Sequence, residues 1–157
     1  MAKIFYGHLV ADQSTPLGNI KVYENARFRW LSFDDSFIQT VIEKNNPSKP
    51  ILSYLSALCC TLNKQSQRVF IAGAGGGAVL HYLNSLNPNR LITAIDICPS
   101  TIRIAQKFFS PPIQIYPGDA FKFIKPSDKY DHFLIDLFSK DKLPQGLTEA
   151  NYYLQCR

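Results

Sequence analysis

The stretch "RVFIAGAGGGA", residues 68–78, decides the fold. Its first half is an apolar run of strand-forming residues, and its second half holds four glycines within five positions. Because glycine has no Cβ, the backbone of such a loop can approach a ligand closely and point N–H groups at it. The stretch predicts a strand that turns directly into a helix, with a cofactor-binding loop at Gly73, Gly75 and Gly77. The alternative is a tight turn that only packs the helix on the strand.

Strand and helix patterns alternate regularly after this loop. Predicted strands cover residues 91–96, 113–119 and 130–136, and predicted helices cover residues 78–85, 98–109 and 120–125 and begin again near residue 148. Strands that alternate with helices form parallel sheets, because the crossover connections are right-handed. We therefore expect an α/β fold with a doubly wound, mostly parallel, Rossmann-like sheet, whose ligand crevice lies beyond the carboxyl ends of the strands.

The first part of the chain has a different pattern. Three segments rich in β-branched and aromatic residues, "NIKVYE", "RFRWLSF" and "FIQTVI", are separated by turn sequences. They predict a small N-terminal domain of antiparallel β-hairpins over residues 1–46. A helix predicted over residues 51–64 then opens a second, nucleoside-binding domain at residues 47–157. Only four sheet strands are predicted before Arg157, so we expect the C-terminal strands of a complete sheet of this type to be missing.

Composition and charge narrow the class of protein. The sequence is 46% hydrophobic and 18% charged, as in ordinary globular proteins, and its apolar runs fall far short of the roughly 20 residues that cross a membrane. The net charge of +5 is spread along the chain without runs of like charge, which does not favour nucleic-acid binding. The sequence contains no C-x-x-C pair. We expect a cytoplasmic protein that uses neither a membrane nor a metal ion.

Two aspartates follow strands at the predicted crevice. Asp96 ends the strand after the glycine loop, 19 residues beyond Gly77, where nucleoside-binding folds place the carboxylate that accepts hydrogen bonds from ribose hydroxyls. Asp119 follows the next strand and could accept a hydrogen bond from an adenine amino group. The alternative for each is a helix N-cap, and for Asp119 both roles can coexist.

A third aspartate, Asp136, ends the last predicted strand at the same crevice, after an apolar run that should be buried. A carboxylate at this position could orient an amine nucleophile or accept its proton. Partial burial would raise its pKa toward a useful value. The alternative is an aspartate that only caps a loop.

Six segments in this order resemble the spermidine synthase (polyamine aminopropyltransferase) family. They are "IKVYENARFRWLSFDDSFIQTVI", "ILSYLSAL", "VFIAGAGGGAVLHYL", "ITAIDICPSTIRIAQKFF", "GDAFKFI" and "YDHFLIDLFSKDKLPQGL". The resemblance covers about residues 14–157 and rests on the order and spacing of the segments. It implies a small N-terminal β domain beside a sheet of the S-adenosylmethionine-dependent methyltransferase type, a nucleoside at the glycine loop, and a homodimer.

The resemblance also implies a role for five residues. Asp96 matches the family's ribose-binding acid, Asp119 the acid that contacts adenine, and Asp136 the aspartate that helps to activate the attacking amine. Gln39 matches a glutamine near the donor pocket, and Tyr54 matches the tyrosine that opens the family's Tyr-His-Glu segment on the substrate side.

Four positions depart from the family pattern. Gly75 replaces an aspartate that grips the donor's aminopropyl amine, Leu55 and Ser56 replace the histidine and glutamate after Tyr54, and Ser139 replaces an acid. Each charged hydrogen bond lost to a cationic substrate weakens binding by on the order of 1–3 kcal/mol. The sequence therefore predicts that the nucleoside half of the site is retained and the polyamine half is weakened.

Four functions fit this pattern. The first is an aminopropyltransferase that uses decarboxylated S-adenosylmethionine and a polyamine, and the second is a methyltransferase that uses S-adenosylmethionine itself. The third is a catalytically silent relative that binds a nucleoside or a protein partner. The fourth is a nicotinamide-dinucleotide protein, since "GAGGGA" also satisfies the G-x-G-x-x-G/A pattern.

Overall fold

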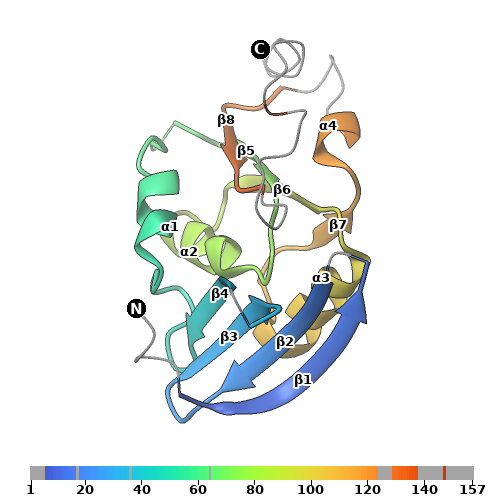
Figure 1. The fold of residues 1–157 in the computed structure, drawn as a ribbon. Coiled ribbons are helices and arrows are strands. Elements are labelled where there is room, and N and C mark those ends of the chain that lie inside the picture. The colour runs from blue at the N-terminus through green and yellow to red at the C-terminus, as the bar shows by residue number, and fades with distance from the viewer. Residues whose placement is uncertain are drawn as a thin grey trace.

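Two four-stranded sheets form the framework of the protein (Figure 1). The computed structural model describes residues 6–16, 18–35, 37–63, 65–123, 129–137 and 147. The first sheet is antiparallel, in the order β1-β2-β3-β4, and the second is parallel, in the order β7-β6-β5-β8. The prediction of antiparallel hairpins followed by a mostly parallel sheet is confirmed.

The antiparallel sheet consists of β1 (His8–Thr15), β2 (Gly18–Glu24), β3 (Phe28–Phe33) and β4 (Phe37–Glu43). In β2 the apolar side chains of Ile20 and Val22 are fully buried, whereas Lys21 and Tyr23, which alternate with them, are only partly buried. β1 was not among the predicted strands. Its sequence lacks a clear alternation of apolar and polar residues, and it is held by pairing with β2.

The parallel sheet consists of β5 (Arg68–Ala72), β6 (Leu91–Asp96), β7 (Ile115–Pro117) and β8 (His132–Ile135). β5 carries the apolar half of the glycine-rich stretch and lies between β6 and β8. Its residues Val69 to Ala72 are completely buried, as expected for a strand covered on both faces. The glycine loop therefore begins at the middle of the sheet.

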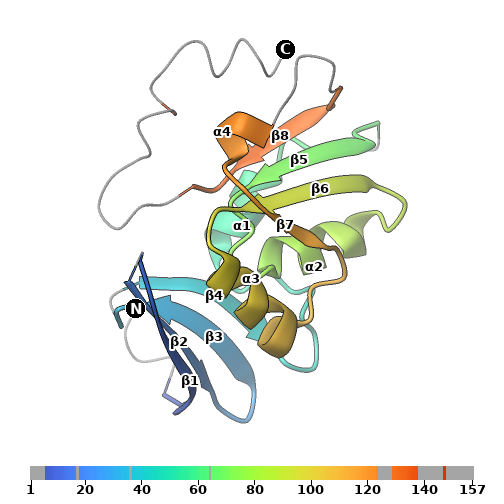
Figure 2. The same ribbon diagram turned by 90° about the vertical axis from the view of Figure 1, so that its right-hand side faces the viewer.

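Helices cover both faces of the parallel sheet (Figure 2). They are α1 (Ser53–Leu58), α2 (Ala78–Leu86), α3 (Pro99–Ile104), the π-helix η1 (Ala105–Phe109) and α4 (Ala120–Phe123). Val69 and Ile71 pack in one core with α1, α2 and α3, whereas Phe70 and Ala72 pack in a second core with Ala120 of α4. This alternation along β5 confirms the doubly wound arrangement.

The larger core also includes the inner face of the antiparallel sheet. Ile20, Val22, Leu31 and Ile42 belong to the same buried cluster as β5 and α2. Figure 2 shows α2 and α3 between the two sheets. The antiparallel sheet is thus packed against the helix that follows the glycine loop, and it can contribute to a site there.

Two predicted helices differ from the observed ones. The helix predicted over residues 51–64 is regular only in α1, because a series of turns follows it and the Asn63 side chain accepts the N–H groups of Gln65 and Ser66. The helix predicted over residues 98–109 changes to the π-helix η1 after Ile104. The helix predicted near residue 148 lies outside the described residues.

Candidate functional site

The glycine loop has the backbone conformation that its sequence predicts. Gly73, Gly75 and Gly77 have φ angles of +86°, +52° and +88°, in the left-handed region that favours glycine. The Gly73 N–H donates to the carbonyl oxygen of Ile95 at 2.9 Å, which fastens the loop to the end of β6. α2 begins directly after Gly77.

Asp96 is the buried carboxylate beneath this loop. Its Oδ2 accepts the N–H of Gly75 at 2.9 Å, its Oδ1 accepts the N–H of Cys98 at 2.9 Å, and the residue is only 9% exposed. Burial raises the pKa of Asp96, while the two backbone hydrogen bonds act in the opposite direction. Cys98, not Asp96, is the N-cap residue of α3. Asp96 therefore shapes the glycine loop, and each oxygen has a further lone pair for a ligand hydroxyl.

Asp119 lies at the same edge of the sheet, after β7. The Gly118 N–H donates to the carbonyl oxygen of Asp96 at 3.0 Å, which holds the two segments together. Asp119 Oδ1 accepts the N–H of Phe121 at 3.0 Å, in the manner of an N-cap of α4. The capping alternative is therefore present in the structure, and adenine recognition by Asp119 stays a prediction.

Asp136 and Tyr54 meet although 82 positions separate them in the sequence. The Tyr54 hydroxyl donates to Asp136 Oδ2 at 3.0 Å. Burial raises the pKa of Asp136, and the hydrogen bond from Tyr54 acts against that shift. Burial and the nearby Asp136 carboxylate raise the pKa of Tyr54 far above its usual value, so Tyr54 remains a donor. The pair lies beside the glycine loop, because the backbone of Asp136 is in close contact with Gly73.

Thr40 of β4 is a contact of the glycine loop that was not predicted from the sequence. Its Oγ1 accepts the N–H of Gly76 at 2.9 Å, and a Cβ on Gly76 would lie 2.7–2.8 Å from three Thr40 side-chain atoms. The register of β3 and β4 shifts between Leu31 and Ser32, so Gln39 is the extra residue of a β-bulge. Gln39 is half-buried at this bulge next to the site, and its role toward a donor stays a prediction. No local sequence signal distinguishes Thr40 from its neighbours.

The Thr40→Val variant is expected to bind methylthioadenosine more weakly and to lose about 1–3 kcal/mol of unfolding free energy. Valine has nearly the shape of threonine but leaves the buried Gly76 N–H without an acceptor. Urea denaturation and calorimetric titration would measure the two effects. Thr40→Ser is the matched control, since it keeps the hydroxyl. Equal nucleoside affinity in the two variants would contradict a role of this hydrogen bond.

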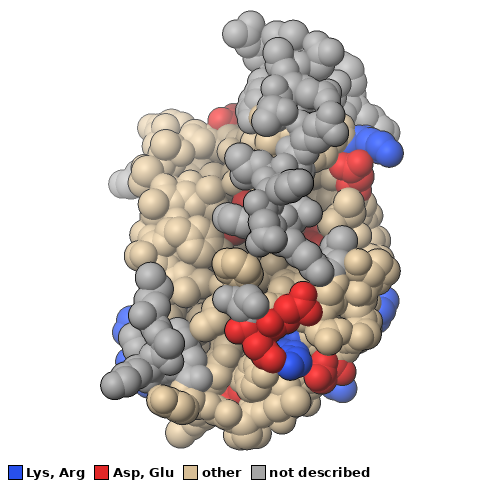
Figure 3. Space-filling model, viewed as in Figure 1, with Lys and Arg blue, Asp and Glu red and all other residues tan. Residues whose placement is uncertain are grey.

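The described residues place limits on other kinds of site. They contain no group of three or more His, Cys, Asp or Glu side chains that could hold a metal ion. No helix among them is long and apolar enough to cross a membrane. Figure 3 shows several acidic side chains of the described residues gathered around a basic side chain on the lower part of one face, with other basic side chains near its edges.

The fold defines a class of protein: a parallel sheet of the S-adenosylmethionine-dependent methyltransferase type, with a glycine loop after its central strand β5 and a small antiparallel sheet beside it. Solved structures share this fold. A probable spermidine synthase from Corynebacterium glutamicum aligns with a TM-score of 0.75 and 16% identity over 93% of this chain and 58% of its own. A spermidine synthase in complex with the transition state analogue AdoDATO aligns with a TM-score of 0.70 and 16% identity over 94% of this chain and 53% of its own.

Sequence comparison leads to one family. Polyamine aminopropyltransferases from Vibrio vulnificus and Neisseria meningitidis serogroup A are 28% and 26% identical to this chain, over 95% and 88% of its length. The chain spans about half the length of these curated relatives, 54% and 56%. No family model matches the sequence. The predicted resemblance is confirmed, since the chain is similar in sequence to polyamine aminopropyltransferases and in fold to spermidine synthases.

Proposed function

We propose that this protein is a spermidine synthase-like transferase that moves an aminopropyl group from decarboxylated S-adenosylmethionine to a polyamine. The observation that carries the proposal is the hydrogen bond between Tyr54 and Asp136 beside the glycine loop. It holds a half-buried carboxylate at the edge of the sheet where Asp96 and Asp119 also lie. The similarity to polyamine aminopropyltransferases and to the spermidine synthase that binds AdoDATO supports the same reaction.

In the proposed reaction, the adenosine part of the donor lies on the glycine loop, with its ribose on Asp96 and its adenine near Asp119. A neutral amine of the acceptor attacks the aminopropyl carbon that is bonded to the positive sulfur. The C–N bond forms, the C–S bond breaks with its electron pair going to sulfur, and methylthioadenosine leaves. Asp136 orients the amine and accepts its proton, and positioning supplies most of the rate acceleration.

The direct test is incubation of the protein with putrescine and decarboxylated S-adenosylmethionine, with chromatographic measurement of methylthioadenosine. We expect product from the native sequence and a loss of about 100-fold or more in Asp136→Asn, which removes the proton acceptor but keeps the shape. Absence of methylthioadenosine in the presence of measurable donor binding would contradict the proposal and favour a catalytically silent nucleoside-binding relative.

The Tyr54→Phe variant should shift the low-pH limb of the activity profile to higher pH. Asp136 accepts the proton of the amine, so activity falls when this carboxylate becomes protonated as the pH decreases. Removal of the Tyr54 hydroxyl takes away the hydrogen bond that lowers the pKa of Asp136, so the pKa rises further. A pH–rate profile would measure the shift. Tyr82→Phe on α2 is the control, because it makes the same loss of a hydroxyl away from Asp136. An unchanged low-pH limb in Tyr54→Phe would contradict the effect of Tyr54 on the pKa of Asp136.

A second candidate function, methyl transfer from S-adenosylmethionine itself, is favoured by one observation. Gly75 has no side chain, so no carboxylate at this position would repel the carboxylate of S-adenosylmethionine. The nearest atom that a Cβ added at Gly75 would meet is Thr40 Oγ1, at 3.4 Å. The proposal of a methyltransferase predicts saturable binding of S-adenosylmethionine. This second proposal names no methyl acceptor.

Gly75→Asp should raise the preference for the decarboxylated donor by about tenfold, because the new carboxylate would repel the carboxylate of S-adenosylmethionine, which the decarboxylated donor lacks. The left-handed φ of +52° at this position is one that aspartate adopts more readily than most residues. Calorimetric titration with both donors would measure the ratio of affinities. Gly75→Asn is the control of equal shape without charge, and the same ratio in both variants would contradict the prediction.

The proposal includes a homodimer in the cytoplasm, since family resemblance implies dimers and the predicted donor and acceptor are small metabolites. Light scattering after size-exclusion chromatography would give the mass in solution. A monomer that retains the transferase activity would contradict the proposed homodimer and leave the proposed reaction in place.

A further inference from the structure

A cavity lies at the opposite edge of the parallel sheet from the glycine loop. It has a volume of about 520 Å³ and is lined by Leu62, Asn63, Leu86, Asn87 and Arg90. These residues belong to the segments before β5 and β6, at the amino ends of the strands. The cavity therefore has no part in the proposed donor site.

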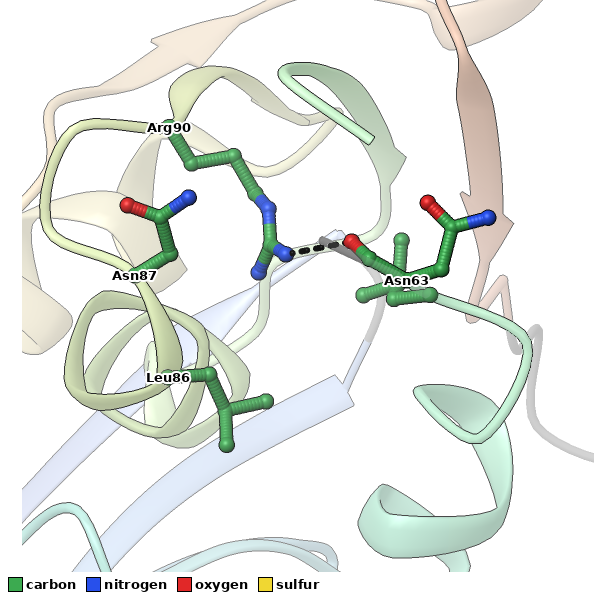
Figure 4. A pocket seen from close by; sticks show the side chains of 5 residues that line it. Asn63, Leu86, Asn87 and Arg90 are labelled. Carbon is green, nitrogen blue, oxygen red and sulfur yellow. Dashed lines mark hydrogen bonds between the residues drawn. The ribbon is translucent and has the colours of Figure 1, made fainter. Parts of the chain in front are cut away.

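Arg90 is the charged group of this cavity, and it is buried, with only 9% of its surface exposed. Its Nε donates to the carbonyl oxygen of Ser66 at 2.7 Å, and one Nη2 hydrogen bond reaches the carbonyl oxygen of Asn63 at 3.2 Å. Nη1 has no hydrogen-bond partner among the described residues, and none of their carboxylates forms a salt bridge with Arg90. Figure 4 shows the guanidinium directed into the space between Leu86 and Asn63.

A buried guanidinium without an anion is unusual, because removal of a charge from water is costly unless a counter-charge is close. Arg90 has two carbonyl oxygens as partners, but carbonyl groups carry no net charge. An anion would supply the counter-charge that the described residues do not, and the planar guanidinium is suited to a carboxylate.

The remaining walls restrict what kind of anion fits. Leu62 and Leu86 are apolar, and Leu86 is 52% exposed at the rim. Asn87 Oδ1 accepts the N–H of Asn89 at 3.0 Å, which leaves the amide nitrogen of Asn87 to donate. The volume lies in the range of small-molecule sites, about 300–1,000 Å³. Apolar walls with a few convergent polar groups suit an anion that has an apolar body.

We propose that this cavity binds a small organic carboxylate, with the carboxylate on Arg90 and the apolar body against Leu62 and Leu86. Nη1 is buried, so the carboxylate reaches it after the side chains that cover it change rotamer, a motion that takes picoseconds to nanoseconds for exposed side chains. Binding stabilises the turn around Asn63 and Ser66, which Arg90 already holds. The site is independent of the proposed transferase reaction.

The test is calorimetric titration of the full chain with sodium hexanoate, hexanol and inorganic phosphate. We expect saturable binding of hexanoate, and binding of hexanol and of phosphate about tenfold weaker or more, since one lacks the charge and the other the apolar body. Absence of saturable hexanoate binding would overturn the proposal. Equal affinity for phosphate or for hexanol would overturn the assignment of a carboxylate with an apolar body.

The variant that tests the location is Asn87→Asp, because substitution of Arg90 would also release the turn at Asn63. Aspartate keeps the acceptor for the Asn89 N–H and places a carboxylate beside Arg90. We expect hexanoate binding to weaken by about tenfold or more, with no loss of melting temperature. Asn89→Asp, an exposed position two residues away, is the control with the same change of charge. Equal hexanoate affinity in the two variants would overturn the location.

Discussion

Asp96→Ala is expected to weaken the binding of methylthioadenosine by at least about 100-fold, or roughly 3 kcal/mol. The substitution removes both oxygens that are proposed to accept hydrogen bonds from the ribose hydroxyls. It also releases the N–H groups of Gly75 and Cys98, which Asp96 holds at 2.9 Å. The loop loses the anchor that sets its shape, so the effect exceeds that of one ligand hydrogen bond. Calorimetric titration with methylthioadenosine would measure the change.

Asp96→Asn is the graded control for this experiment. Its amide oxygen can accept one of the two backbone N–H groups, whereas the amide nitrogen cannot accept the other. We expect an affinity between those of the native sequence and of Asp96→Ala. Circular dichroism would establish that each variant is folded. Unchanged nucleoside affinity in a folded Asp96→Ala variant would contradict the placement of the nucleoside at this loop.

Gly73→Ala should lower the free energy of unfolding by about 3 kcal/mol or more, the range of severe backbone and packing effects. A Cβ at this position would overlap the carbonyl oxygen of Asp136, and the φ angle of +86° disfavours any side chain. Because the obstacle is backbone of the neighbouring strand, no rotamer change can relieve it. Urea denaturation would measure the loss, and we expect the Tyr54–Asp136 pair to move as β8 shifts.

Gly118→Ala is the matched control for Gly73→Ala. Gly118 precedes Asp119 at the same edge of the sheet, and a Cβ there would meet only Phe123 and Ile95 side-chain atoms, at 3.8 and 3.9 Å. These are ordinary van der Waals contacts, so we expect a change within about 1 kcal/mol. Similar losses in the two variants would contradict the close approach of Gly73 to β8.

Most of the parallel sheet could be predicted, because the sequence patterns that specify its strands and turns each lie within a few neighbouring residues. The apolar residues of β5 and the glycines after them specify a buried strand and a tight turn within a few residues of chain. β1 and the early end of α1 were missed because pairing with β2 and a side-chain turn at Asn63 outweigh weak local preferences.

The candidate site was predictable to a different degree for each residue. Asp96, Asp119 and Asp136 could be grouped, because the carboxyl ends of parallel strands meet at one edge of a sheet. The capping role of Asp119 could be named only as an alternative, since the same residue type serves a helix and a ligand. The importance of Thr40 had no signal, because it depends on a bulge in one sheet meeting a loop of another.

Local chemistry along the chain was sufficient to specify the strands of the parallel sheet, the glycine loop between β5 and α2, and the acids at or just after the ends of β6, β7 and β8. Contacts between residues distant in sequence required the folded chain. These include the hydrogen bond of Tyr54 to Asp136, the support of Gly76 by Thr40, and the enclosure of Arg90 without a carboxylate partner among the described residues. The physical reason is that dihedral preferences and hydrophobic periodicity act over a few residues, whereas burial and its effect on charge depend on which surfaces pack together.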